Sequence, residues 1–338
     1  MFIFPTVPRF VQSLGVAFVL GLGTLGCQPT VEQVGQNGQV GDAPAVDAMD
    51  ITVSIPPQQY FLEKIGGDLV RVSVLVPGNN DPHTYEPKPQ QLAALSEAEA
   101  YVLVGLGFEQ PWLEKIKAAN GNMKLIDSAQ GITPLEMEEH DHSHGEEEGH
   151  DDHSHDGHDH GSESEKEKSM GAVMVADPHI WLSPTLVKQQ ATTIAKGLTE
   201  LDPDNREQYE ANLAAFLAEL EQLNQELGQI LQPLPQRKFI VFHPSWAYFA
   251  QDYNLVQIPI EVEGQEPSAQ ELKQLIDTAK ENNLTMVFGE TQFSTKSSEA
   301  IAAEIGAGVE LLDPLAADWS SNLKAVAQKI ANANSAQP

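Results

Sequence analysis

The chain has 338 residues, enough for two domains with separate hydrophobic cores. With 19 basic and 49 acidic residues its formal net charge is −30, which argues against nucleic acid or anionic lipid as a partner because both are polyanions. The single cysteine excludes an internal disulfide and any zinc site built from several thiolates. A tight metal site must therefore use imidazole and carboxylate ligands.

Residues 1–27 have the features of an export segment. Arg9 supplies a positive charge, and residues 10–26 are apolar and glycine-rich but short for a membrane span. Gly26-Cys27 resembles the end of the lipobox of bacterial lipoproteins, although Thr24 stands where an aliphatic residue is usual. We expect a periplasmic or otherwise extracytoplasmic protein, with either a lipid on Cys27 or ordinary cleavage nearby. Residues 28–50 are rich in Gly, Gln and Pro and are predicted to be a flexible tether.

Short apolar runs rich in Val, Ile and Leu follow, separated by segments with helical patterns. This alternation predicts βαβ units and a parallel sheet. The predicted strands are 51–55, 70–76, 100–107 and 123–127. Residues 136–168 then interrupt the pattern. They contain no Leu, Ile, Val or Phe, so they cannot offset the entropy cost of ordering by burying surface, and we predict a disordered insertion.

Two helices are predicted after the insertion. Ser183 suits the N-cap and Pro184 the first turn of a helix that reaches 198. Asp202 and Pro203 are likewise predicted to be the N-cap and the first helical residue of a longer helix. This helix ends near Leu231 because two prolines follow. Apolar residues recur along the longer helix at alternating steps of four and three, so one stripe faces a partner throughout. They are Tyr209, Leu213, Phe216, Leu220, Leu223, Leu227 and Ile230.

A second set of strands completes the predicted fold, at 238–242, 255–261, 285–290 and 309–313. The fold class is α/β, with two lobes that each hold a four-stranded parallel sheet flanked by helices. The predicted lobes span 51–202 and 236–332, and one long backbone helix at 203–232 joins them. Such a helix is roughly 40 Å long, enough to run along both lobes. Because this single stiff helix links them, we expect limited relative motion.

Three histidines lie outside the insertion, each where a ligand is expected. His83 follows the strand 70–76, and His243 follows the first strand of the second lobe. Ligands of open parallel sheets bind beyond the carboxyl ends of the strands. His179 lies in the turn before the helix capped by Ser183. A single such histidine is most often structural, but three placements together favour a shared site.

Two carboxylates also close predicted strands of the second lobe. Asp313 ends 309–313, and ligation of a metal is its favoured role. Glu290 ends 285–290, and a capping or hydrogen-bonding role is favoured for it, with ligation left open.

The donor set indicates which metal the site would take. Three neutral imidazoles and one oxygen form a tetrahedral site suited to Zn²⁺, whereas manganese prefers more carboxylate and water. Ligand type alone does not exclude Cu²⁺ or Ni²⁺. Because imidazole must be neutral to bind, affinity is expected to fall below roughly pH 6.

Stretches around these residues resemble the metal-binding proteins of bacterial ABC importers, in the order found there. They are NNDPHTYEPKPQQLAAL, ADPHIWLSP, HPSWAYFAQDYNL, EGQEPSAQEL, FGETQFS and LLDPLA. The resemblance covers about 51–332 and points to the zinc branch of that family. It implies a metal in the cleft between two lobes, a long connecting helix, and delivery of the ion to a membrane permease. We also expect a monomer.

The resemblance further implies the ligands. The family's first two are histidines in these motifs, which match His83 and His179. The third is glutamate in manganese members and histidine in zinc members, and here it is His243. The fourth is an aspartate matching Asp313, although a water or another carboxylate serves in some zinc members. Acidic, histidine-rich loops are typical of the zinc members.

The insertion is expected to hold several weaker, interchangeable zinc sites, because a disordered chain has no fixed geometry. It either collects zinc for the cleft, senses abundance and lowers uptake, or is a solvated acidic segment with incidental metal affinity. Its accessory ligands would be His140, His142, His144, His150, His153, His155, His158 and His160.

Two rival functions are compatible with these features. A zinc hydrolase also needs three histidines and an open fourth position, with Glu290 as base. Against it, the chain has no HExxH motif, and Asp313 in the fourth position would leave no water to activate. A periplasmic zinc buffer would act through the insertion and use the lobes as a scaffold. The favoured prediction is a zinc-binding component of an ABC importer that is not an enzyme.

Overall fold

The computed structural model describes residues 48–135, 176–261 and 265–335. The predicted export segment with Cys27, nearly all of the predicted tether and the whole histidine-rich insertion lie outside the described residues.

The first lobe is built on a parallel sheet with strand order β2-β1-β3-β4. The strands are β1 (Met49–Val53), β2 (Val70–Val74), β3 (Ala100–Leu103) and β4 (Lys124–Asp127). Helices α1 (Pro56–Gly66), α2 (Pro89–Leu95) and α3 (Glu109–Ala119) connect them. The first strand begins two residues earlier than predicted, because Asp50 pairs with Arg71 on the neighbouring strand. All strand pairs are parallel, as the βαβ pattern predicts.

The second lobe repeats this arrangement, with strand order β6-β5-β7-β8. Its strands are β5 (Lys238–Val241), β6 (Val256–Pro259), β7 (Met286–Glu290) and β8 (Gly308–Leu312). Its helices are α6 (Ala247–Asp252), α7 (Ala269–Glu281), α8 (Lys296–Ile305) and α9 (Trp319–Ser335). Two four-stranded parallel sheets flanked by helices confirm the predicted fold class.

Helix α4 (Pro184–Leu201) begins as predicted, since the Ser183 hydroxyl accepts a hydrogen bond from the Leu186 amide. The long helix α5 (Arg206–Leu231) begins later than predicted. Residues 203–205 form one turn of 3₁₀ helix instead. The Asp202 carboxylate does not cap the helix, because it accepts hydrogen bonds from the side chains of Asn205 and Tyr209.

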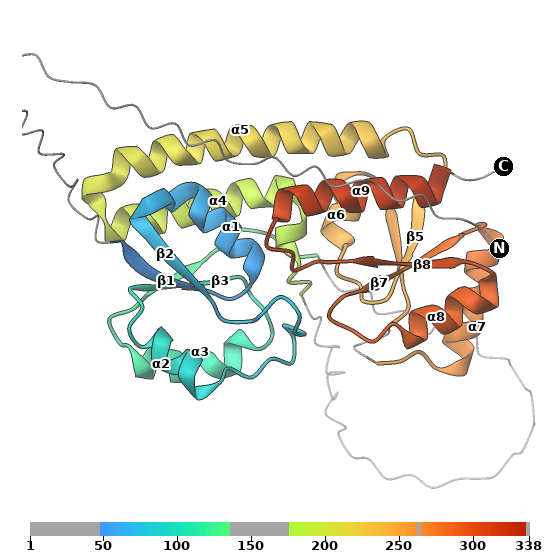
Figure 1. The fold of residues 1–338 in the computed structure, drawn as a ribbon, viewed down its shortest axis with the longest axis horizontal. Helices are drawn as coiled ribbons and strands as arrows, with labels where there is room; N and C mark the ends of the chain where they lie inside the picture. The colour runs from blue at the N-terminus through green and yellow to red at the C-terminus, as the bar shows by residue number, and fades with distance from the viewer. Residues whose placement is uncertain (1–47, 136–175, 262–264, 336–338) are drawn as a thin grey trace, which may run out of the picture. The chain divides into compact units, whose positions relative to one another are not determined.

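Helix α5 lies along helices of both lobes (Figure 1). Its predicted apolar stripe is buried or half-buried along its whole length, which is why an amphipathic helix of 26 residues is stable here. Ion pairs join it to α1, α4 and α9, although exposed pairs of this kind contribute only about 0–1 kcal/mol each. They are Lys64–Glu219, Lys188–Glu221 and Lys324–Glu226.

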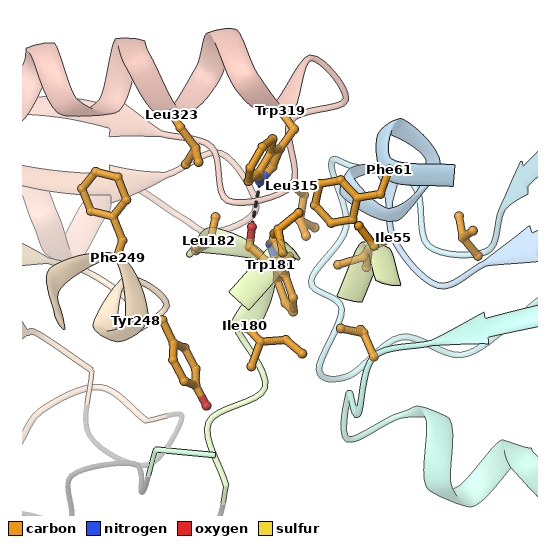
Figure 2. Packing of buried hydrophobic residues seen from close by; sticks show 14 of the residues in the cluster. Ile55, Phe61, Ile180, Trp181, Leu182, Tyr248, Phe249, Leu315, Trp319 and Leu323 are labelled. Carbon is orange, nitrogen blue, oxygen red and sulfur yellow. Dashed lines mark hydrogen bonds between the residues drawn. The ribbon is translucent and has the colours of Figure 1, made fainter. Parts of the chain in front are cut away.

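One hydrophobic cluster runs continuously from the first sheet through the helices to the second sheet. Figure 2 shows two tryptophans at its centre. Trp319 donates from its indole nitrogen to the carbonyl of Trp181 over 2.7 Å, and Trp181 donates likewise to the carbonyl of Pro314. The Trp319 ring also meets Phe61 of α1 edge-on, with centroids 5.0 Å apart. These contacts hold the turn that precedes α4 between elements of both lobes.

None of the helices in the described part of the chain combines the length and the apolar character needed to cross a membrane.

Candidate metal centre

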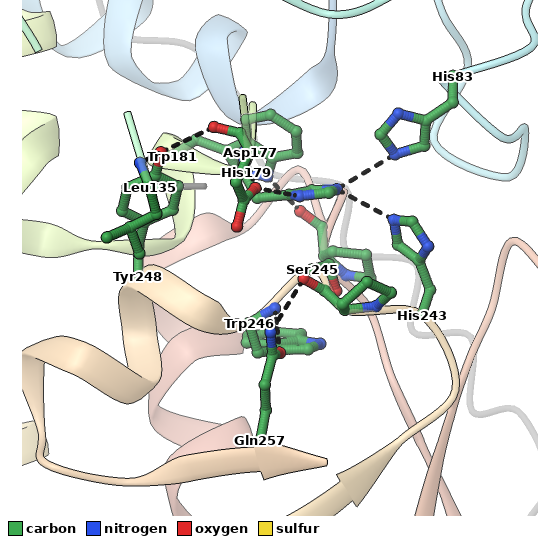
Figure 3. A network of polar contacts seen from close by, with 12 residues as sticks. His83, Leu135, Asp177, His179, Trp181, His243, Ser245, Trp246, Tyr248 and Gln257 are labelled. Atoms are coloured by element: carbon green, nitrogen blue, oxygen red, sulfur yellow. Dashed lines mark hydrogen bonds and ion pairs between the residues drawn. The ribbon is translucent and has the colours of Figure 1, made fainter. Parts of the chain in front are cut away.

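Three histidines from three separate segments converge in the structure. His83 comes from the loop after β2, His179 from the turn before α4, and His243 from the loop after β5. Figure 3 shows their rings turned toward one another. The Nε2 atom of His179 lies 3.2 Å from Nε2 of His83 and 3.3 Å from Nε2 of His243. Among the described residues, these are the side chains whose candidate ligand atoms all lie within 4.8 Å of one another.

The separations match the geometry that zinc imposes. In a tetrahedral site with Zn–N distances of about 2.0–2.1 Å, two ligand nitrogens lie about 3.3 Å apart. The two Nε2 separations of 3.2 and 3.3 Å therefore leave room for one ion bound by three imidazoles.

Two buried carboxylates set the orientation of two of the rings. Asp177 Oδ1 lies 2.7 Å from Nδ1 of His179, and Glu261 Oε1 lies 3.1 Å from Nδ1 of His243. A carboxylate only accepts hydrogen bonds, so in each neutral ring Nδ1 carries the hydrogen and Nε2 presents its lone pair to the centre. Carboxylate partners of this kind orient metal-binding histidines in many proteins.

The three imidazoles differ in their protonation. Burial, and then the neighbouring rings of His179 and His243, lower the pKa of His83 to about 2. Burial also lowers the pKa of His179, against the opposing effect of Asp177. For His243 burial acts in the same direction, but the hydrogen bond to Glu261 and the charge of Glu290 outweigh it and raise its pKa. Two of the three rings are therefore held neutral, which is the form that binds a metal.

Glu290 lies at the end of β7 and lines the same small cavity as the three histidines. Its Oε1 atom accepts hydrogen bonds from the hydroxyl of Ser245 and the indole of Trp246. Its other oxygen, Oε2, is buried and has no hydrogen-bond partner among the described residues. Burial raises the pKa of this carboxyl to about 7. Direct ligation by Glu290 stays a prediction, because its oxygens are not part of the three-histidine group.

Asp313 follows β8 and is engaged by protein groups. Its Oδ1 atom accepts hydrogen bonds from Nε2 of Gln292 over 2.8 Å and from the backbone amide of Leu315 over 3.0 Å. Like Glu290, it lies outside the group of mutually close ligand atoms. Its predicted role as fourth ligand therefore also stays a prediction.

The sequence interpretation did not assign roles to three residues of the centre. Asp177 stands two positions before His179, in the same Asp-Pro-His pattern that contains His83. Glu261 ends the predicted strand 255–261, so the rule that selected Glu290 and Asp313 could have selected it as well. Gln292 carries no comparable signal.

Comparisons with known proteins identify the family of this chain. Residues 51–333 match the model of the family described as "Zinc-uptake complex component A periplasmic". The high-affinity zinc uptake system protein ZnuA of Bacillus subtilis is 30% identical over 296 residues, which is 86% of each chain. A crystal structure of ZnuA is 85% identical, with a TM-score of 0.74, and covers 85% of this chain and 100% of that one.

A second solved structure, described as a 138–173 deletion mutant of ZnuA with zinc bound, is also 85% identical with a TM-score of 0.74. The match covers 86% of this chain and 100% of that one. The two-lobe fold, the convergent histidines and the match over nearly all described residues lead to one conclusion. The chain belongs to the family of periplasmic zinc-uptake complex components, the zinc-binding solute-binding proteins of ABC importers.

Proposed function

We propose that this protein captures a zinc ion as cargo between its lobes and delivers it to the permease of an ABC importer. The ligands would be the Nε2 atoms of His83, His179 and His243. The observation that carries the proposal is the convergence of these three atoms, at separations that suit tetrahedral zinc. The role is binding and transfer without covalent chemistry, so zinc-loaded protein should not accelerate ester hydrolysis or CO₂ hydration.

The set of ligands supports zinc over manganese. All three convergent donors are imidazole nitrogens, and the carboxylates that contact the rings, Asp177 and Glu261, are used to orient them. Manganese prefers oxygen ligands, which this group does not supply.

The histidine-rich insertion is proposed as an accessory to this centre. Its two flanks are joined, since the amide of Asp177 donates to the carbonyl of Leu135 over 2.9 Å. Tyr248 of α6 binds both flanks, because its hydroxyl accepts from the Leu135 amide and donates to the Asp177 carbonyl. The flank residue Asp177 also holds the His179 ring. Zinc collected by the insertion would therefore be released next to the centre, which favours collection over sensing.

The test is a competitive titration with zinc and manganese at neutral pH, using protein that lacks residues 138–167. We expect one tight zinc site to survive the deletion and manganese to bind far more weakly. The solved relative described as a deletion mutant with zinc bound supports this expectation. Introducing His83→Ala into the same deleted protein should remove the tight site. Loss of tight binding on deletion alone would instead assign the function to the insertion, as in a zinc buffer.

Transfer to the permease needs a separate test, in cells that depend on this importer for zinc. His243→Ala should abolish uptake together with binding. Surface variants that keep normal affinity but lose uptake would locate the docking surface.

Attachment to the membrane through Cys27 is proposed from the export segment. It is checked by the mass of the mature protein, with Cys27→Ser as the control.

A further inference from the structure

The turn that carries His179 precedes helix α4 of the first lobe but is hydrogen-bonded to the second lobe. Apart from the ligand rings, four hydrogen bonds between described residues join 177–183 to that lobe, all 2.6 or 2.7 Å long. They link Asp177 to Tyr248, Trp181 to Pro314, Trp181 to Trp319, and Ser183 to Asp252. The turn is therefore attached to both lobes.

The loop that carries His83 is attached differently. Apart from the ligand rings, one side-chain hydrogen bond between described residues joins 75–88 to the second lobe, from Nε2 of Gln292 to the carbonyl of Gly78. The other side-chain bonds of this loop stay within the first lobe, such as that from the Tyr85 hydroxyl to Gln91. A shift of one lobe against the other would therefore disturb the His83 side of the centre more than the His179 side.

Helix α6 supplies two of the four bonds that hold the His179 turn. Tyr248 and Asp252 stand four positions apart in this helix, so they lie on the same face of it. The helix begins at Ala247, shortly after His243. One short segment of the second lobe therefore carries one histidine of the centre and holds the turn that carries another.

The contact of Tyr248 reaches the ring of His179 through Asp177. The Tyr248 hydroxyl accepts from the amide of Leu135 over 2.9 Å and donates to the carbonyl of Asp177 over 2.7 Å (Figure 3). The carboxylate of Asp177 in turn contacts both the backbone amide and Nδ1 of His179. Fixing the backbone of Asp177 therefore fixes the group that orients the imidazole.

The contact of Asp252 acts at the other end of the turn. Its Oδ2 atom accepts from the hydroxyl of Ser183, and the same hydroxyl accepts from the amide of Leu186 in the first turn of α4. The cap of α4 is thereby joined to the second lobe. Tyr248 and Asp252 together hold both ends of the segment 177–183.

We propose that Tyr248 and Asp252 are positioning residues that fasten the His179 turn to the second lobe, so that His179 and His243 form a preset pair of zinc ligands. This inference rests on the proposed zinc centre and adds the residues that set its geometry from outside. Neither residue contacts the metal, because Tyr248 acts through Asp177 and Asp252 acts through Ser183. The pair keeps its Nε2 separation when the lobes shift relative to each other.

The first experiment measures the zinc affinity of the tight site in the full chain. Tyr248→Phe should weaken it by roughly 10-fold, as is typical when an outer contact of a metal site is removed. Tyr253→Phe is the matched control. Its hydroxyl donates to Asn224 of α5 and does not touch the turn, so this variant should keep the wild-type affinity.

Asp252 is tested with a pair of variants. Asp252→Ala removes the acceptor for the Ser183 hydroxyl and should weaken zinc binding, whereas Asp252→Asn keeps an oxygen that can accept and should retain most of the affinity. Wild-type affinity in both Tyr248→Phe and Asp252→Ala would overturn the proposal.

A double-mutant cycle tests the route through Asp177. Combined with Asp177→Asn, Tyr248→Phe should cause little further loss of zinc affinity, because both changes disturb the orientation of the same ring. Combined with Asp81→Asn, in the other Asp-Pro-His copy, Tyr248→Phe should cause its full loss. Equal losses in the two backgrounds would contradict the proposed route.

NMR of the metal-free chain separates positioning from a general effect on stability. The Nδ1 hydrogen of His179 is buried against Asp177, so it should exchange slowly and give a resolved signal, which His179→Ala identifies by its loss. Tyr248→Phe should shift or broaden this signal, and Tyr253→Phe should not. A lower free energy of unfolding in Tyr248→Phe with an unchanged signal would reduce Tyr248 to a structural role and overturn the proposal.

His179→Ala also tells failure of this inference from failure of the centre itself. If it abolishes tight zinc binding while Tyr248→Phe and Asp252→Ala bind normally, only the proposed fastening is wrong. If His179→Ala keeps tight binding, the three-histidine centre is wrong.

Discussion

The tripeptide Asp-Pro-His occurs twice in the centre, and its two copies hold their histidines differently. In both copies the aspartate accepts a hydrogen bond from the histidine's backbone amide, over 2.8 Å at Asp81 and 2.9 Å at Asp177. Only Asp177 also binds the ring, through Nδ1 of His179. The second oxygen of Asp81 accepts from the Thr84 hydroxyl instead. The same local turn therefore fixes only the backbone of His83, whereas it fixes both the backbone and the ring of His179.

Burial accompanies this difference. His179 is 2% exposed and packs against Trp181 in the core that spans both lobes, whereas His83 is half-buried in the loop after β2. His179 is also the ring that both other histidines approach through Nε2. In the proposed centre the buried copy would therefore provide a rigid central ligand, and the loop copy a ligand whose ring is held by fewer contacts.

The largest expected effect comes from replacing the central ligand. Four-ligand zinc sites are worth about 10–16 kcal/mol, or roughly 3 kcal/mol per ligand, so His179→Ala should weaken zinc binding by about 100- to 1,000-fold. His83→Ala should cost less, because its ring has not been held in place by a carboxylate. Competition titrations of both variants measure the two losses, and an equal loss would break the proposed difference.

The second prediction concerns the two aspartates. Asp177→Asn should weaken zinc binding by about 10- to 100-fold, because the amide supports the His179 tautomer less well than the carboxylate does. Asp81→Asn is the matched control in the other copy of the turn. It should change zinc affinity much less, since Asp81 does not contact the ring of His83. Similar losses in the two variants would mean that the backbone turn matters more than the ring contact.

The smallest effect is expected from Glu109, which fixes the loop between β3 and α3. Glu109 is buried at the start of α3 and accepts hydrogen bonds from the amides of Val104, Gly105 and Leu106. Phe108 directly precedes Glu109. Its ring meets the ring of Tyr85 edge-on, with centroids 6.2 Å apart, and Tyr85 lies in the loop that carries His83. Burial raises the pKa of Glu109 to about 7, although the hydrogen bonds from Ser54 and the backbone amides oppose it.

The sign of the pH dependence follows from this raised pKa. Between the unfolded pKa of 4.5 and about 7, the folded protein holds more protons on Glu109 than the unfolded chain does. The free energy of unfolding should therefore fall as pH rises through this window, by at most about 1.4 kcal/mol per pH unit from this group.

Urea unfolding of metal-free protein at pH 5, 6 and 7 measures this slope. Glu109→Gln should flatten it, even if the variant is less stable at every pH. The exposed Glu114→Gln in the same helix should keep the wild-type slope. An unchanged slope in Glu109→Gln would argue against a raised pKa for this group.

Much of the centre was predictable because it depends on local pattern. Apolar runs separated by helical segments indicate a parallel sheet, and in such sheets ligands bind beyond the carboxyl ends of the strands. That rule selected His83, His243, Glu290 and Asp313. The start of α5 was not predictable in the same way, because the Asp202 side chain is used by Tyr209, a contact that forms only once the helix has folded.

By itself, the sequence determined the α/β class with two sheets, the helix start at Ser183, and three histidines as candidate ligands of zinc. The first two follow from residue type and spacing along the chain, and the candidate ligands also from the motifs that the chain shares with metal-binding proteins of ABC importers. Only the tertiary structure decided how the surrounding polar groups are used. Asp177 and Glu261 orient rings, and Asp313 binds Gln292 from 21 positions away in the chain. Such pairings depend on how loops from different strands pack, and short-range sequence patterns carry no information about that packing.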